Sequence, residues 1–443
     1  MLSEKLFGVI SLGCDKNRVD TEKLLGLIKE RGYRLTDDLA SAQIVIVNTC
    51  AFLESARRES IDTILECADY KTGNLEKIVV TGCLPQKFIG ELFEPLSEAD
   101  IFLGINDYKK IFEALENSYR TGKRENIVGQ GKDGYIKPRV LTTDEHFAYL
   151  KIADGCYNHC TYCLIPKIRG KYRSYPMETL LEEAENLGEI AELIIVAQDT
   201  TRYGEDLYGR NAFVELLRKL SELKNIRKIR LLYCYPDVIG DELMDEIANN
   251  EKILKYIDIP LQHSEDRVLK LMNRKGTRAG YLALFEKLRK KIPKIAIRST
   301  FISGFPTETE TEFENMLAFI KEAKLFNCGF FAYSREPDTG AYRMKPQIHH
   351  STKKRRVRAL YEAQAEVSYQ ILSQFVGKEI EVLCDGIDYE KNCFVGRAYF
   401  NAPDIDGKVY FHAAEAMQGE TYKVMIDKND NYDLYGRTED YSL

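Results

Sequence analysis

Short segments made almost entirely of apolar residues alternate with helical patterns along the first part of this 443-residue chain. Three such segments are residues 7–10, 44–47 and 78–80, and apolar residues recur at helical spacing between them. Strands that are apolar on both faces belong to parallel sheets covered by helices on either side. The pattern predicts a doubly wound α/β domain at residues 1–120.

A second series of strands and helices begins after residue 145. Residues 121–145 lack apolar periodicity and are rich in Gly, Lys and Asp, so we expect a linker or a long surface connection there. The expected strands of the second series cover residues 149–153, 193–197, 229–233, 256–259, 295–301 and 329–333. Six β/α repeats with right-handed crossovers predict an open parallel barrel over residues 146–372, because a closed barrel would need eight.

The last part of the chain, residues 375–443, has the short alternating strands of a small antiparallel β-barrel. It carries seven basic and fourteen acidic residues, whereas the whole chain has a net charge of only −6. The protein as a whole is therefore not a strongly basic nucleic-acid binder. A short basic run at 353–358 precedes this domain, and we expect it to be the solvated face of a helix or a contact to RNA.

The chain contains 11 cysteines, no apolar run long enough to cross a bilayer and no export signal. An odd cysteine count in a chain without an export signal argues against a disulfide framework. We therefore expect a cytoplasmic protein whose cysteines are buried filler, nucleophiles or metal ligands.

Three cysteines follow the first strand of the second series at C-x3-C-x2-C spacing: Cys156, Cys160 and Cys163. Soft thiolates suit iron–sulfur clusters, and three of them would leave the fourth iron of a cubane open to a small chelating molecule. The alternative is a structural zinc site with His159 as the fourth ligand. Structural zinc usually uses paired cysteine arms, and the sequence has no second pair nearby.

A second set of cysteines is scattered in sequence, but each member follows an expected strand: Cys14, Cys50 and Cys83. The carboxyl ends of parallel strands face one crevice, where ligands bind, so these three residues are expected to converge. Gly13 and Gly82 would let the backbone approach a bulky inorganic group. The alternative is three unrelated buried thiols. The other five cysteines have no partner at ligand spacing, and we interpret them as structural.

The spacing of the first trio, with Tyr162 just before the third cysteine, resembles the radical S-adenosylmethionine (SAM) superfamily. That resemblance implies that the open iron binds SAM and that one-electron cleavage yields a 5′-deoxyadenosyl radical. The order of the parts also resembles a known family: three cysteines ahead of such a barrel, then a β-domain that looks like a TRAM domain. This order resembles the methylthiotransferase family, and the resemblance covers essentially the whole chain. The matching motifs are GC at 13–14, NTCAF at 48–52, TGCL at 81–84, KIADGC at 151–156 and RGKYRS at 169–174. The family resemblance implies that the N-terminal trio holds a second four-iron four-sulfur cluster.

Within that family, several motifs resemble the RimO branch, which modifies an aspartate of small-subunit ribosomal protein S-12, rather than the branch that modifies transfer RNA. They are AQDTT at 197–201, LLYCYP at 231–236, DIPLQH at 258–263 and NAPDIDG at 401–407. Asp15, Asn401 and Thr307 depart from the usual pattern without removing a ligand. The acidic β-domain agrees with a basic protein substrate, since it would repel RNA phosphates. The alternative is that the acidic surface of this domain serves only to keep the protein soluble.

The resemblance implies an enzyme that replaces a hydrogen on the β-carbon of an aspartate with a methylthio group. Such a C–H bond has no acidic proton, so a cofactor radical must supply the hard step. SAM would serve both as methyl donor and as radical source, and Tyr162 and Gln198 are candidates for contacting it. The alternative role for Gln198 is a hydrogen bond at the end of its strand.

The expected partners are ribosomal protein S-12 or the small subunit, an electron donor and a sulfur donor. We expect no membrane association and no strong direct binding of nucleic acid. The rival functions are methylthiolation of transfer RNA and a non-catalytic iron–sulfur or zinc protein that binds ribosomes.

Overall fold

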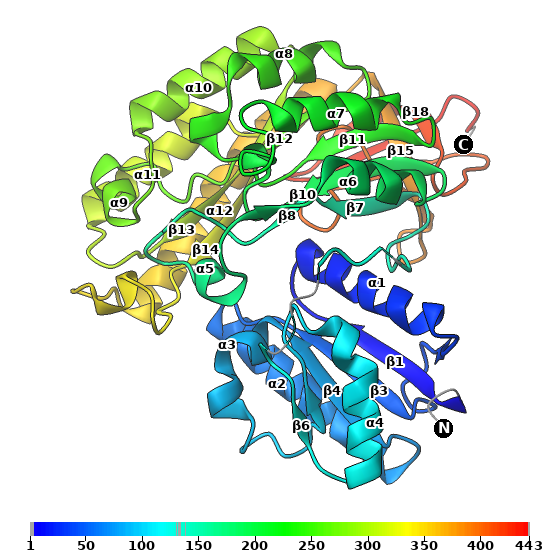
Figure 1. The fold of residues 1–443 in the computed structure, drawn as a ribbon. Helices are drawn as coiled ribbons and strands as arrows, with labels where there is room; N and C mark the ends of the chain where they lie inside the picture. Colours follow the sequence, from blue (N-terminus) through cyan, green and yellow to red (C-terminus); the bar gives the residue numbers. More distant parts are fainter. Residues whose placement is uncertain (1–3, 130, 132–133, 138, 442–443) are drawn as a thin grey trace. The chain divides into compact units, whose positions relative to one another are not determined.

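The computed structural model describes residues 4–129, 131, 134–137 and 139–441 (Figure 1). It divides into two compact units. The first unit comprises Met1–Thr142, Asp154–His159 and Cys163–Tyr175, and the second comprises Thr143–Ala153, Cys160–Tyr162 and Pro176–Leu443.

The first unit is built on a six-stranded parallel sheet in the order β2-β1-β3-β4-β5-β6. Its strands are β1 (Leu6–Ser11), β2 (Arg34–Leu35), β3 (Ile44–Thr49), β4 (Lys77–Gly82), β5 (Ile101–Phe102) and β6 (Glu125–Asn126). Its helices are α1 (Asp15–Glu30), α2 (Glu54–Ala68), α3 (Cys83–Leu92), α4 (Ile111–Thr121) and the short α5 (Ile165–Ile168). The strand order reverses at β1, which has β2 on one side and β3 on the other. The prediction of a doubly wound α/β domain is confirmed.

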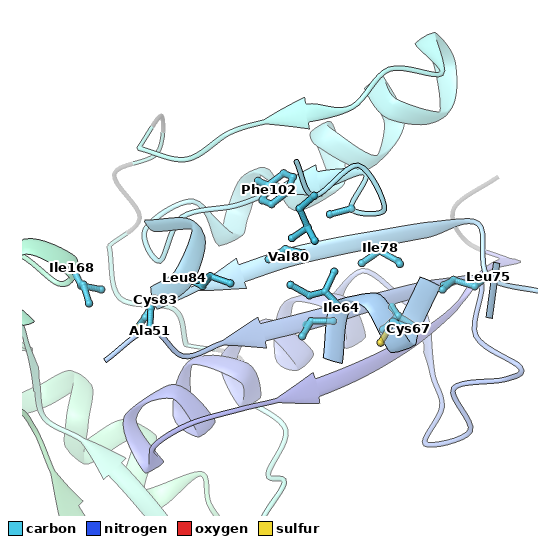
Figure 2. Packing of buried hydrophobic residues seen from close by; sticks show 14 of the residues in the cluster. Ala51, Ile64, Cys67, Leu75, Ile78, Val80, Cys83, Leu84, Phe102 and Ile168 are labelled. Carbon is cyan, nitrogen blue, oxygen red and sulfur yellow. The ribbon is translucent and has the colours of Figure 1, made fainter. Parts of the chain in front are cut away.

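Apolar side chains project from both faces of this sheet. Along β3, Val45 and Val47 point into one core cluster, while Ile44 and Ile46 point into the other. Figure 2 shows part of the first cluster, in which Val80 of β4 lies near Leu84 of α3. Each fully buried side chain of this size contributes about 1.5–3 kcal/mol relative to an exposed one. Burial on both faces is the reason that these strands read as continuous apolar runs.

The segment expected as a linker is tied closely to the first unit. Its residues 125–126 form the edge strand β6, and Val140 N donates to Glu22 O (3.0 Å). The Glu22 carboxylate, fully buried on α1, also accepts hydrogen bonds from Arg139 Nε (2.8 Å) and from the backbone and hydroxyl of Thr142 (2.9 Å each). The segment also adds the buried Ile136 to the core of this unit, with Ile127 packed against that core. Its apolar residues are too few and too irregularly spaced to reveal this attachment in the sequence.

The second unit contains a six-stranded parallel sheet in the order β14-β13-β12-β11-β10-β7, as predicted for an open barrel. Its strands are β7 (Phe147–Lys151), β10 (Ile190–Val196), β11 (Ile226–Leu231), β12 (Ile253–Asp258), β13 (Ala296–Ser303) and β14 (Asn327–Ala332). The helices are α6 (Met177–Glu185), α7 (Ala212–Glu222), α8 (Asp241–Asn249), α9 (Asp266–Leu271), α10 (Arg278–Lys291), α11 (Glu310–Ala323) and α12 (His350–Leu372). A separate two-stranded sheet pairs β8 (Ala153–Asp154) with β9 (Arg173–Ser174).

Helix α12 carries the basic run at 353–358. The expected solvated face is confirmed for Lys354, Arg355 and Arg358, which are exposed, but not for the other two basic residues. Lys353 is buried and donates to Tyr333 O (2.8 Å). Arg356 is also buried, and it binds Glu308 (2.6 Å) and Glu310 (2.8 Å). Although α12 has 23 residues, no helix in the described part of the chain is long and apolar enough to cross a membrane.

The C-terminal strands close into a five-stranded barrel in the order β15-β16-β17-β19-β18. They are β15 (Glu379–Asp388), β16 (Cys393–Arg397), β17 (Val409–His412), β18 (Thr421–Asn429) and β19 (Leu434–Arg437). The predicted barrel is confirmed, although one pair, β17 and β19, is parallel. The chain crosses from β17 to β18, and β19 then fills the gap between them, antiparallel to β18 and so parallel to β17.

Buried charges fasten this β-barrel to the strand starts of the second unit's sheet. Glu192 of β10 accepts hydrogen bonds from Arg230 (2.6 Å) and Arg397 (2.7 Å). The inaccessible Asp406 side chain accepts from Tyr256 Oη (2.7 Å) and Arg298 Nε (3.2 Å). The motif at 401–407 thus contributes an anchor between the two parts of this unit.

Replacing Asp406 with alanine removes one carboxylate partner of Arg298 and the acceptor of the Tyr256 hydroxyl, while Arg298 keeps its ion pair with Asp258. Leaving a buried donor without its acceptor costs about 1–3 kcal/mol. We expect D406A to lower the free energy of unfolding by that amount in urea titrations followed by circular dichroism. The exposed Glu415 of the same domain provides the control, E415A, which should change stability by less than about 0.5 kcal/mol. Equal stability of D406A and E415A would contradict the anchor.

Candidate active site

The cysteines of the N-terminal trio lie at one edge of the first unit's sheet, just past three adjacent strands. Cys14 follows β1 and caps the N-terminus of α1, Cys50 follows β3, and Cys83 begins α3 directly after β4. Register pairs Ser11 with Asn48 and Thr49 with Gly82, so these strand ends are level. The trio therefore occupies the carboxyl edge beside the switch point between β1 and β3, where doubly wound sheets bind ligands.

Gly13 allows Cys14 and Cys50 to approach each other. It has φ of +89°, and a Cβ atom built on it would lie 2.7 Å from Cys50 Cβ and 3.0 Å from Cys50 Sγ. Gly82, with φ of +95°, leaves no room either, because a Cβ atom there would lie 2.3 Å from Asn48 Oδ1. Asn48 Oδ1 is itself buried without a hydrogen-bond partner among the described residues. Backbone conformation and crowding thus both require glycine beside these thiols.

Burial and the positive charge of Arg169 shift the pKa of Cys50 and Cys83 in opposite directions. Burial raises the pKa of Cys83 to about 12, and the guanidinium of Arg169 opposes that rise. Burial also raises the pKa of Cys50. The N-termini of α1 and α3 point their positive ends at this edge, which favours negative charge on the sulfurs once they are deprotonated.

Arg169 is the residue on which this site is organised, and its role could not be inferred from its sequence position. Its inaccessible guanidinium binds Asp20 of α1 (2.9 Å), Asp154 (3.2 Å) and Asn17 Oδ1 (3.2 Å). Its Nη2 also lies 3.7 Å from Cys83 Sγ. Because Asp154 stands two residues before Cys156, Arg169 connects the N-terminal trio to the segment that carries the other cysteines.

Two cysteines of the C-x3-C-x2-C motif, Cys156 and Cys163, belong to the same compact unit as the N-terminal trio. Cys156 Sγ accepts a hydrogen bond from Asn158 N (3.3 Å), and Cys163 Sγ accepts one from Ile165 N (3.4 Å). Helix α5, which follows Cys163, packs Ile168 into the same core cluster as Cys83 (Figure 2). Backbone N–H groups aimed at sulfur stabilise thiolates and tune iron–sulfur clusters.

The third cysteine of this motif, Cys160, belongs to the second unit. Arg274, nearly buried, lies with Nη1 4.0 Å from Cys160 Sγ and with its guanidinium 4.1 Å from the ring centroid of Tyr235. Arg274 Nη2 also donates to Pro260 O. Pro260 and Tyr235 belong to the motifs at 258–263 and 231–236, so those motifs help to place a cation beside this thiol.

The two residues expected to contact SAM both lie in the second unit. Gln198 is the second residue after the end of β10, and its buried Oε1 has no hydrogen-bond partner among the described residues. Its side-chain oxygen is therefore not used in a strand-end hydrogen bond and is available to a ligand. Tyr162 is partly buried and packs on the apolar cluster that includes Met272 and Phe305.

Each trio offers three thiols, the ligand type that iron–sulfur clusters use. All eleven cysteines lie in the described residues, and none forms a disulfide. Among the described residues, no group of three or more His, Cys, Asp or Glu side chains is placed to hold a single metal ion. The remaining cysteines, Cys67, Cys234, Cys328, Cys384 and Cys393, are buried or partly buried.

Replacing Arg169 with methionine leaves the Asp20 and Asp154 carboxylates buried without their shared cation. We expect R169M to lower the free energy of unfolding by about 3–5 kcal/mol, and R169K to recover only part of it because lysine lacks the planar fork. Chemical unfolding of the purified variants measures this. Arg173, exposed in the same segment, provides the control R173M, and an R169M protein as stable as R173M would refute the organising role of Arg169.

Comparison with known protein families divides the chain into three matching regions. Residues 6–104 match a family described as Uncharacterized protein family UPF0004, residues 150–320 match the Radical SAM superfamily, and residues 376–438 match the TRAM domain. Among solved structures, the radical S-adenosylmethionine methyltransferase TsrM from Kitasatospora setae has a TM-score of 0.56 at 14% identity. That match covers 87% of this chain and 79% of TsrM, and it establishes similarity of fold alone.

Curated relatives are far more similar in sequence. The ribosomal protein uS12 methylthiotransferase RimO of Clostridium botulinum (strain Eklund 17B / Type B) is 47% identical over 441 residues, which covers 98% of each chain. The protein of the same name from Thermoanaerobacter sp. (strain X514) is 45% identical, covering 98% of this chain and 99% of its own. Identity of this degree over whole chains, with the cysteine geometry described above, places the protein in the ribosomal protein uS12 methylthiotransferase RimO family.

Proposed function

We propose that this protein is a radical SAM methylthiotransferase that adds a methylthio group to the β-carbon of an aspartate in small-subunit ribosomal protein S-12. The observation that carries the proposal is the arrangement of the first unit. Three cysteines converge at the carboxyl edge of its sheet, and Arg169 links them to the segment of Cys156. Membership of the RimO family supports the same function.

Two four-iron four-sulfur clusters fit the residues that we assign to them. Cys14, Cys50 and Cys83 would hold one cluster, and the missing Cβ at Gly13 leaves room beside two of these thiols. Cys156, Cys160 and Cys163 would hold the other. When bound, the clusters and SAM supply one-electron chemistry and a sulfur to be transferred, which amino-acid side chains cannot do.

The residues around the thiols position and protect this chemistry. Arg169 and Arg274 place positive charge beside Cys83 and Cys160, which stabilises the deprotonated ligands. The amide oxygen of Gln198 is free to accept a hydrogen bond from SAM, and Tyr162 would contact SAM beside it. The protein's part is therefore binding, orientation and charge stabilisation.

The β-domain favours a basic protein over RNA as the substrate. Asp385 binds Arg397, and Asp406 binds Arg298. Most of the remaining acidic residues of this domain are exposed, for example Glu390, Glu415 and Glu439. Their charge would attract a basic ribosomal protein and repel the phosphates of transfer RNA, the acceptor of the related branch. The reaction also requires an electron donor and a sulfur donor, and we place it in the cytoplasm, where ribosomes are modified.

Substitution of Gly13 tests the assignment of the N-terminal trio. Anaerobic reconstitution of the wild-type protein should yield about eight irons per chain, as expected for two four-iron clusters. G13A should retain only about four, because the added methyl group would collide with Cys50. Gly32 also has positive φ but open space around it, so G32A separates crowding from backbone strain and should keep the wild-type iron content. Full iron loading of G13A would overturn the assignment.

The substrate is tested in cells with and without the gene by mass spectrometry of ribosomal protein S-12 and of bulk transfer RNA. We expect loss of a methylthio group from S-12 alone. Loss from transfer RNA alone would move the protein to the other branch.

In purified protein, replacing Cys156, Cys160 and Cys163 with alanine should abolish reductive cleavage of SAM, and surviving cleavage would show that another site performs it.

A further inference from the structure

A cavity of about 770 Å³ lies within the second unit, where the β-domain meets the starts of the parallel strands. It is lined by Ala191, Arg227 and Leu254, near the starts of three neighbouring strands, and by Phe375 together with the first residues of β15. Cavities of about 300–1,000 Å³ are typical of small-molecule sites.

This cavity is separate from the site proposed for SAM. Ala191 is the second residue of β10, whereas Gln198 is the second residue after the end of the same strand. A strand rises about 3.3 Å per residue, so the two positions lie roughly 20 Å apart at opposite ends of the sheet. The radical chemistry proposed above does not use the cavity.

Positive charge dominates the lining. Eight basic residues and three acidic ones contribute to it. Of the acidic residues, Glu192 is bound by two arginines, Glu379 pairs with Lys423 (3.1 Å), and Glu381 is exposed. The cavity thus carries excess positive charge, although the domain that forms one of its walls is acidic overall.

Three of the basic residues have ammonium groups that make no ion pair and no hydrogen bond within the described structure: Lys294, Lys324 and Lys378. Their side chains are exposed, while the backbone that carries two of them is anchored. Lys294 O accepts a hydrogen bond from Tyr399 Oη (3.0 Å), and Lys324 O accepts one from Arg289 Nη2 (2.9 Å). Lysines of this kind act as point charges toward phosphate groups.

Aromatic rings and aliphatic side chains line the rest of the cavity. Phe326 and Phe375 both line it, with ring centroids 6.2 Å apart, and each packs against Phe400, at 4.8 Å and 4.9 Å. Tyr399 and Leu254 add to this apolar surface. Aromatic surfaces beside a positively charged groove are the arrangement that proteins use to stack bases and hold phosphates.

We propose that this cavity binds a nucleotide, with its base on the aromatic surface and its phosphate groups on Lys294, Lys324 and Lys378. The nucleotide is either a free one or the phosphorylated end of an RNA strand, since both present the same chemistry. An acidic peptide fits less well, because its carboxylates bring no flat ring for the aromatic surface. The inference stands independently of the proposed methylthiotransferase reaction.

The test uses the full-length, cluster-loaded protein and the fluorescence anisotropy of N-methylanthraniloyl-ATP. Saturating SAM is present throughout, so that an adenosine site at the other end of the strands is blocked. We expect saturable binding that is at least tenfold weaker in the double variant K294E/K378E. Lys290 is exposed on α10 and does not line the cavity, so K290E should bind like the wild type. Thermal unfolding of each variant checks that the fold is retained.

Competition experiments identify the chemistry that is recognised. AMP should displace the probe at least tenfold better than adenosine. A 5′-phosphorylated RNA oligonucleotide that competes better than AMP would identify an RNA end as the ligand, and one that competes equally or worse would identify a free nucleotide. The proposal is overturned if the wild type shows no saturable binding, if K294E/K378E binds as tightly as the wild type, if adenosine equals AMP, or if poly-glutamate competes as well as AMP.

Discussion

In a parallel sheet every strand ends at the same edge, and the chemistry of this protein depends on that constraint. Cys14, Cys50 and Cys83 are far apart in sequence, yet they lie past three adjacent strands whose ends are level. Gln198 lies just past the corresponding edge of the second unit's sheet, and its buried amide oxygen has no hydrogen-bond partner among the described residues. The order and direction of the strands thus bring together side chains that are far apart along the chain.

Buried arginines stabilise the arrangement of these groups by forming ion pairs with carboxylates. Arg169 neutralises two carboxylates and lies against Cys83, so the segment that carries Cys156 and Cys163 joins the same compact unit as the N-terminal trio. At the other end of the second unit's sheet, Arg230 and Arg397 share Glu192 and fasten the β-domain. A buried charge is costly unless paired, so each of these arrangements strongly disfavours separation of its parts.

Patterns of apolar residues predicted the architecture well, because strand and helix periods follow directly from backbone geometry. The apolar runs at 44–47 and 78–80 lie inside β3 and β4, and the six strands of the second series are all present. Prediction was weaker where polar contacts decide the structure. The basic run at 353–358 looked solvated, but Arg356 is buried against Glu308. Residues 125–126 carry no apolar signal, yet they extend the first sheet.

The sequence by itself determined which chemistry is available. Thiols at C-x3-C-x2-C spacing and after successive strands, glycines beside them and an acidic C-terminal domain are all readable from local pattern. Tertiary structure alone decided which charged groups surround those thiols, that Asp385 and Asp406 bind arginines, and that a basic cavity forms beside an acidic domain. The reason is physical: periodicity records what a residue does within its own strand or helix, whereas an ion pair between residues 20 and 169 leaves no periodic trace.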